Sequence, residues 1–67
     1  MYILTDEPKY SGSLAAGAFD AIDQVYGTEG FTREQAVEAI TTVIAVGTEE
    51  ADQLFSSLVW NEHISEV

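Results

Sequence analysis

Residues 31–58 constrain the fold of this chain more than any other stretch, because they contain helix start signals on both sides of a turn. Thr32 is followed three positions later by Gln35, which is the spacing of a capping box. This pattern predicts a helix over residues 32–45. Its apolar positions recur at intervals of three and four residues, as one face of an amphipathic helix requires: Ala36, Val37, Ile40, Val43 and Ile44.

A turn at Gly47 separates this helix from the next one. Gly47 is the expected end of the helix over residues 32–45, because glycine readily adopts the backbone conformations that end helices. Thr48 is the expected N-cap of a helix over residues 48–60, which has two glutamates in its first turn. The clearest amphipathic pattern of the chain lies in this helix and consists of Ala51, Leu54, Phe55, Leu58 and Val59.

An earlier segment, residues 14–26, also has the pattern of an amphipathic helix. Ser13 is its expected N-cap and Gly27 its expected end. The predicted buried stripe is widened on one flank by Phe19 and Tyr26 and consists of Leu14, Ala18, Ala21, Ile22 and Val25.

The two ends of the chain have the features of short strands. Residues 2–5 are largely apolar and favour extended structure, and Pro8 prevents their continuation. Residues 63–67 alternate polar and apolar side chains, which is the period of a strand. The sequence therefore predicts one mainly α domain over residues 1–67, with three helices and a short two-stranded pairing of the N- and C-terminal segments.

Acidic residues dominate the charge of the chain. Twelve Asp and Glu face two basic residues, Lys9 and Arg33, so the formal charge is −10. Such self-repulsion opposes the compact state at low salt and is screened at molar salt. The composition resembles that of cytoplasmic proteins of salt-loving archaea, which implies a halophilic source; an acidic protein of an ordinary organism and a phage mimic of nucleic acid are the alternatives.

Two further features favour a cytoplasmic location. No apolar run reaches the ~20 residues of a membrane span. The N-terminal residues lack the basic segment of a signal peptide and carry Asp6 and Glu7 instead.

The order of the predicted elements resembles a small winged-helix or helix-turn-helix domain. The resemblance covers residues 14–67 and includes the glycine turn and the tail LVWNEHISEV over residues 58–67. It implies that the helix over residues 48–60 takes the place of a DNA-recognition helix. The side chains that would then face DNA are Thr48, Glu49, Gln53, Ser56 and Ser57.

The charge of that helix departs from the family pattern. Its N-terminal part carries Glu49, Glu50 and Asp52, which repel phosphates. DNA-binding proteins draw affinity from several Lys or Arg contacts to phosphate, and this chain has two basic residues in all. The charge therefore disfavours DNA as a partner.

Catalytic chemistry is not expected. The chain has one histidine, His63, no cysteine and no glycine-rich phosphate loop, so a nucleophile with its base cannot be assembled. Glu62, His63 and Glu66 are better explained as a solvated acidic tail than as metal ligands. We expect no metal, no cofactor and no small-molecule ligand.

The apolar residues say more about function than the residues that could act in catalysis or metal binding. Three tyrosines, three phenylalanines and one tryptophan are many for so small a core, and aromatic side chains at a rim often anchor interfaces. A helix face made of small residues also permits close approach. The candidate interface, for a protein partner or a second copy in a homodimer, consists of Ala15, Ala16, Gly17, Ala18, Tyr26 and Trp60.

The expected function is that of a non-enzymatic, acidic interaction module that acts through protein–protein contact, such as an accessory factor in gene regulation. A DNA-binding transcriptional regulator of a halophile is the first alternative. An acidic inhibitor that mimics DNA is the second.

Overall fold

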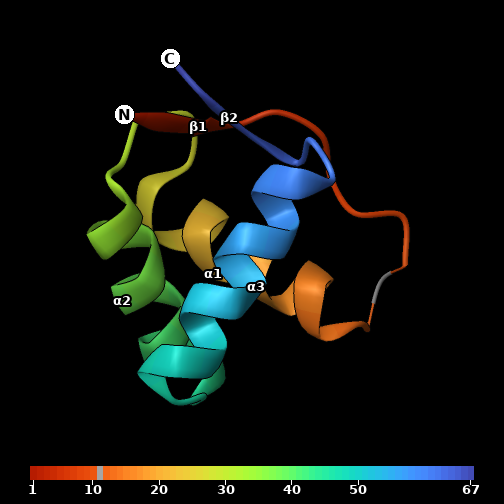
Figure 1. Cartoon of the computed structure of the whole chain (residues 1–67), viewed down its shortest axis with the longest axis vertical. Helices are drawn as coiled ribbons and strands as arrows, with labels where there is room; N and C mark the ends of the chain where they lie inside the picture. The colour runs from red at the N-terminus through yellow and green to blue at the C-terminus, as the bar shows by residue number, and fades with distance from the viewer. Residues whose placement is uncertain (11) are drawn as a thin grey trace.

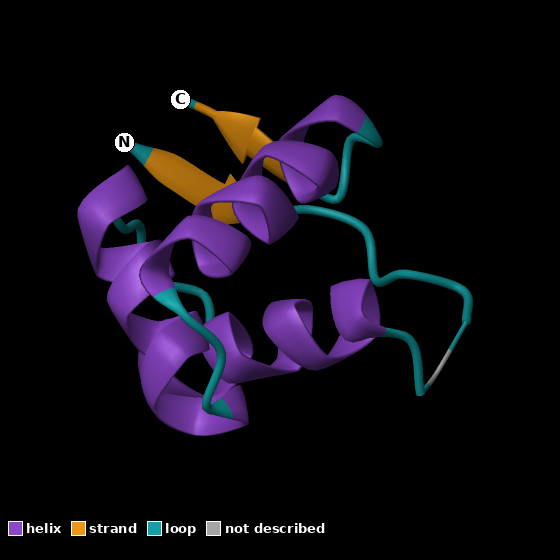
Figure 2. Ribbon diagram, turned by 60° about the horizontal axis from the view of Figure 1, so that its bottom comes forward, coloured by secondary structure: helices purple, strands orange, loops and turns teal. Residues whose placement is uncertain are grey.

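The computed structural model describes residues 1–10 and 12–67, and within them three helices pack around one core (Figure 1). A two-stranded antiparallel sheet, made from the two ends of the chain, covers one end of the helices (Figure 2). The predicted mainly α fold and the pairing of the terminal segments are confirmed. In chain order the elements are β1 (Tyr2–Leu4), α1 (Leu14–Tyr26), α2 (Arg33–Ile44), α3 (Thr48–Trp60) and β2 (Ile64–Glu66).

Side-chain caps fix the starts of the first two helices. Ser13 precedes α1, and its Oγ accepts a hydrogen bond of 3.1 Å from the Ala16 N–H. Thr32 precedes α2 and forms a reciprocal pair with Gln35. The Gln35 N–H donates to Thr32 Oγ1 at 3.1 Å, and the Thr32 N–H donates to Gln35 Oε1 at 2.9 Å. The predicted N-cap and capping box are therefore confirmed.

The turn between α2 and α3 differs from the prediction. Helix α2 ends at Ile44, and Ala45, not Gly47, takes the left-handed conformation that caps it, with φ 54° and ψ 42°. Gly47 is instead the N-cap of α3, and Thr48 is the first helical residue, so α3 has no side-chain cap. The helix thus ends within one residue of its predicted bound, and the difference lies in which residue caps it.

The N-terminal strand β1 bonds to β2 on one side and to the α1–α2 loop on the other. The register pairs Tyr2 with Glu66 and Leu4 with Ile64. On its other side, β1 bonds to Phe31, which directly precedes the cap of α2: the Tyr2 N–H donates to the Phe31 carbonyl at 2.8 Å, and the Phe31 N–H donates back at 2.9 Å. The strand thereby fixes the end of the chain against the α1–α2 loop.

Every buried side chain among the described residues is apolar. The ring of Tyr2 meets that of Phe55 edge to face, with centroids 5.0 Å apart, so β1 also seals the core. The core runs from α1 through α2 and α3 to β2, and its largest fully buried members are Phe31, Phe55, Ile22, Ile40, Leu58 and Ile64.

The buried face of α1 differs from the predicted one at its two ends and on one flank. Leu14 and Val25 were expected in the buried stripe, but they are 55% and 52% exposed. They are the first and the last but one residue of α1, whereas Ala18, Ala21 and Ile22, in the middle of the same stripe, are buried as predicted. Phe19, expected on the flank, is also buried. The buried face is therefore broader in the middle of the helix and shorter along its axis than predicted.

Gly17, inside α1, and Gly27, which caps it, should change the stability of the fold in opposite directions when each is replaced by alanine. A Cβ at Gly17 would lie 3.7 Å from Ile44 Cγ2, an ordinary contact, whereas Gly27 has φ 59°, which side chains rarely tolerate. We expect Gly17→Ala to raise the free energy of unfolding by about 0.5–1 kcal/mol. Gly27→Ala should lower it by about 1 kcal/mol or more. Urea denaturation followed by circular dichroism measures both, and a destabilised Gly17→Ala variant would contradict the close but open packing of α1 on α2.

Candidate interaction surface on the third helix

One face of α3 is turned away from the core along its whole length. Phe55 and Leu58 are fully buried, and the opposite side carries residues at positions i, i+3, i+4 and i+7, which lie in one row on a helix. All four members of this row are exposed. We call it the outer α3 face, and it consists of Gln53, Ser56, Ser57 and Trp60.

Trp60 is the most prominent residue of this face. Its side chain is 85% exposed. A tryptophan that folds into a core or an interface buries about 150–250 Å². Trp60 forgoes that burial within the chain, so its apolar ring remains available for contact with another molecule.

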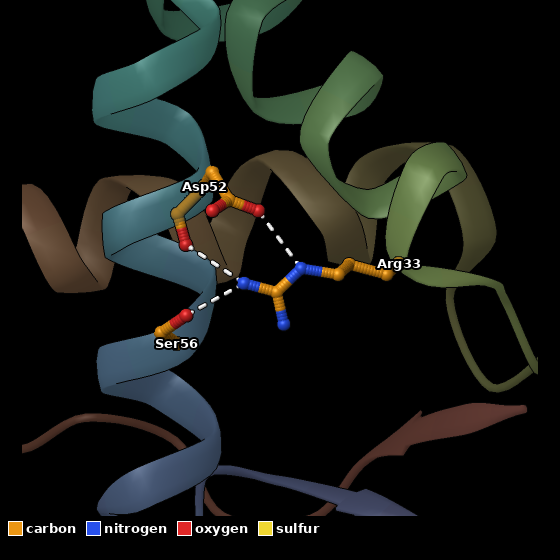
Figure 3. A network of polar contacts seen from close by, with 3 residues as sticks. All are labelled: Arg33, Asp52 and Ser56. Carbon is orange, nitrogen blue, oxygen red and sulfur yellow. Dashed lines mark hydrogen bonds and ion pairs between the residues drawn. The ribbon is translucent and has the colours of Figure 1, made fainter.

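Arg33 links α2 to α3 beside this face (Figure 3). Its Nε donates to Asp52 Oδ1 at 2.8 Å, and its Nη2 donates to Ser56 Oγ at 2.6 Å and to the Asp52 carbonyl at 3.5 Å. The guanidinium carbon also lies 4.9 Å from the centroid of the Phe55 ring. The only arginine of the sequence is thereby fixed against α3, and its charge is paired.

The pairing shifts the ionisation of both partners. The hydrogen bond from Arg33, helped by its charge, lowers the pKa of the Asp52 carboxyl from its usual value. The hydrogen bond to Asp52 raises the pKa of Arg33 in turn. From the sequence, Asp52 was considered only as one of the carboxylates that repel phosphates. A sequence gives no distance between an arginine in one helix and an aspartate in another, so this contact could not be found from it.

A set of hydrogen bonds holds the end of α3 that bears Trp60. Asn61 Nδ2 donates to the Ser57 carbonyl at 2.9 Å. The Thr5 hydroxyl donates to the Glu62 carbonyl at 2.8 Å, which connects the segment after β1 to the turn after α3. His63 Nδ1 lies 2.7 Å from the carbonyl oxygen of Asp6, so this nitrogen carries the proton and donates. The histidine serves to tie two segments together.

The structure separates the members of the candidate interface. Ala16 and Ala18 are buried, so they are not available to a partner, and that part of the prediction is wrong. The small-residue face does admit a close neighbour, but the neighbour is Ile44 of the same chain, beside Gly17. Ala15 packs against the core, and Tyr26 is half-buried, with its ring centroid 5.8 Å from that of Phe31. Of the six residues, Trp60 is the exposed one.

The residues expected to face DNA differ from the candidate interface, because they all lie on the surface of the protein. Every one of them is exposed, and three of them belong to the outer α3 face. The other two lie at its N-terminal end, where Glu50 adds a further exposed carboxylate. In chain order the set is Thr48, Glu49, Gln53, Ser56 and Ser57.

Three kinds of site were also sought in the described part of the chain. Residues 1–10 and 12–67 contain no cluster of three side chains suited to a metal ion, and they form no pocket. Within the same residues, no helix has the length and apolar character needed to cross a membrane. Comparison with protein-family models, with curated proteins and with solved structures found no match to this chain.

The ion pair predicts how Asp52 titrates. Its folded pKa lies below the ordinary value of about 3.9, so the pair stabilises the fold above that value and is lost as the pH falls through the folded pKa. Arg33→Gln should return the pKa of Asp52 toward the ordinary value, as measured by NMR titration of its carboxyl carbon. Lys9→Gln removes an equal charge without touching Asp52 and is the control. Equal effects of the two variants would show that net charge, not the contact, sets the pKa.

Proposed function

We propose that this protein is a non-enzymatic interaction module that works through protein–protein contact, with the outer α3 face as its contact surface. The observation that carries this function is the 85% exposure of Trp60, at one end of a row of exposed, uncharged side chains. Tryptophan is among the residues that most often dominate the energy of protein interfaces.

The rigidity of the surface supports this role. The buried side chains of Phe55 and Leu58 hold α3 against the core, and Arg33 donates a hydrogen bond to a serine of this helix. The turn after the helix is held by the hydrogen bond from the Thr5 hydroxyl to the Glu62 carbonyl. A surface that is ordered before binding loses less conformational entropy when a partner docks. A small face of this kind can therefore support specific binding.

The small number of basic residues, and the pairing of Arg33 with Asp52, favour a protein partner over DNA. Affinity for a duplex depends on Lys and Arg that neutralise phosphates. Arg33 is bound to Asp52 and Ser56, and Lys9 is the other basic residue of the sequence. If the resemblance to winged-helix domains holds, α3 keeps the exposed position of a recognition helix and contacts a protein in place of DNA, as in an accessory factor of gene regulation.

The charge favours a saline setting for this function. At a net charge of −10 and a low ionic strength, carboxylates repel one another and most protein partners of the same sign. At about 1 M salt the Debye length is about 3 Å, which confines this repulsion to direct neighbours. A cytoplasm with molar salt, as in a halophile, fits these conditions.

Photo-crosslinking in the native host tests the function. A photoreactive residue at Ser57, on the outer α3 face, should give an adduct with a protein. The same residue at Asp20, exposed on α1, should give none. Trp60→Ala should remove the Ser57 adduct and change the free energy of unfolding by less than about 0.5 kcal/mol, because the side chain lies outside the core.

The identity of the adduct decides between the functions. An adduct of twice the mass of the chain identifies a second copy as the partner and still supports protein contact. An adduct with DNA, or equal protein adducts from Ser57 and Asp20, would contradict the proposed function.

A further inference from the structure

The charges along the outer α3 face are distributed unevenly. Its centre holds the uncharged side chains of Gln53, Ser56 and Ser57. Glu49 is exposed one turn before this centre, and Glu62 is exposed two residues after Trp60. The face is therefore uncharged in the middle, and one exposed carboxylate precedes it and another follows it along the chain.

The contact of Arg33 sharpens this contrast. Asp52 lies on α3 between the two ends, and an unpaired carboxylate there would extend the negative charge along the helix. Its Oδ1 instead accepts a hydrogen bond of 2.8 Å from Arg33, and the guanidinium continues to Ser56 Oγ. The middle of the face thus presents a neutralised pair beside hydroxyl groups.

Trp60 adds a second attraction for cations at one end. The face of an indole ring attracts an ammonium or guanidinium group, by about 0.5–1 kcal/mol at an exposed site. The carboxylate-bearing Glu62 follows two residues later, at the turn held by the Thr5 hydroxyl. A lysine or arginine at this end of α3 therefore meets the π surface of Trp60, and the negative charge of Glu62 lies two residues further along the chain.

We propose, on the basis of the function proposed above, that the partner docks a helix with Lys or Arg at its two ends and small or apolar residues between them. The charged groups must match a span of about 16 Å, which is the rise of α3 from Glu49 to Trp60. Charge complementarity at both ends, between groups in direct contact, fixes the register of the docked helix.

The same charges disfavour a second copy of this chain as the occupant. Two copies of α3 docked antiparallel place Glu49 of one against Glu62 of the other, and a parallel arrangement places each glutamate beside its equivalent. Both arrangements bring like charges together at each end, which disfavours a complex. The docked helix therefore belongs to a different, basic protein.

Two synthetic peptides test this inference. Both are helix-forming, about 16 residues long, free of tryptophan and identical in composition. One carries its lysines in two groups near its ends, about eleven residues apart, which places them about 16 Å from each other along the helix, and the other carries them together in the middle. Binding is followed by the fluorescence of Trp60, the only tryptophan of the protein. The end-charged peptide should bind about fivefold more tightly at low salt, and the preference should shrink at molar KCl.

Matched variants show where the preference arises. Glu49→Gln combined with Glu62→Gln should abolish the preference for the end-charged peptide. Asp20→Asn combined with Asp23→Asn removes the same charge from the exposed side of α1 and should leave the preference intact. Equal binding of the two peptides, or equal effects of the two double variants, would overturn the inference. The proposed function has a separate test, since a protein adduct at Ser57 can be found whatever the charge pattern of the partner.

Discussion

Repulsion among carboxylates is the constraint on which the rest of this structure depends. The chain carries a net charge of −10 and has a core small enough to leave a narrow margin of stability, on the order of 3–5 kcal/mol. Among the described residues the buried side chains are all apolar, so each carboxylate stays in contact with water. Strand β1 further stabilises the fold, because it bonds to β2 and to Phe31 while the ring of Tyr2 packs on Phe55. Both ends of the chain are thereby used to hold the helices together.

The small number of basic residues also shapes the candidate surface. One of the two basic residues, Arg33, is placed where it holds α2 against α3 and neutralises Asp52. Its position leaves the middle of the outer α3 face without unpaired charge, while Trp60 lies exposed at one end. The proposed cationic partner would link binding to stability, because its positive charge would relieve part of the repulsion that opposes folding.

Local sequence signals predicted most of the fold, and contacts between elements account for what they missed. The bounds of α1 and α3, the cap by Ser13 and the capping box of Thr32 follow from side chains within a few residues of each other. The roles of Gly47 and Thr48 depend on which residue caps α2, and that residue is Ala45. The burial of Ala16 and Ala18, the exposure of Leu14 and the contact of Arg33 with Asp52 depend on which helix lies against which. No local pattern encodes that choice. Of the six residues of the predicted interface, Trp60 is the exposed one, and its part in binding stays a prediction.

The most direct test of this account is the free energy of unfolding of the whole chain as a function of KCl concentration at neutral pH. If the repulsion of carboxylates is the main force opposing the fold, stability rises steeply between about 0.01 and 0.1 M, where the Debye length falls from about 30 to 10 Å. It then rises more slowly toward about 1 M, where the length is about 3 Å. A stability that stays constant or falls over the first of these ranges would contradict the account, because it would mean that the surface charges do not act against the core.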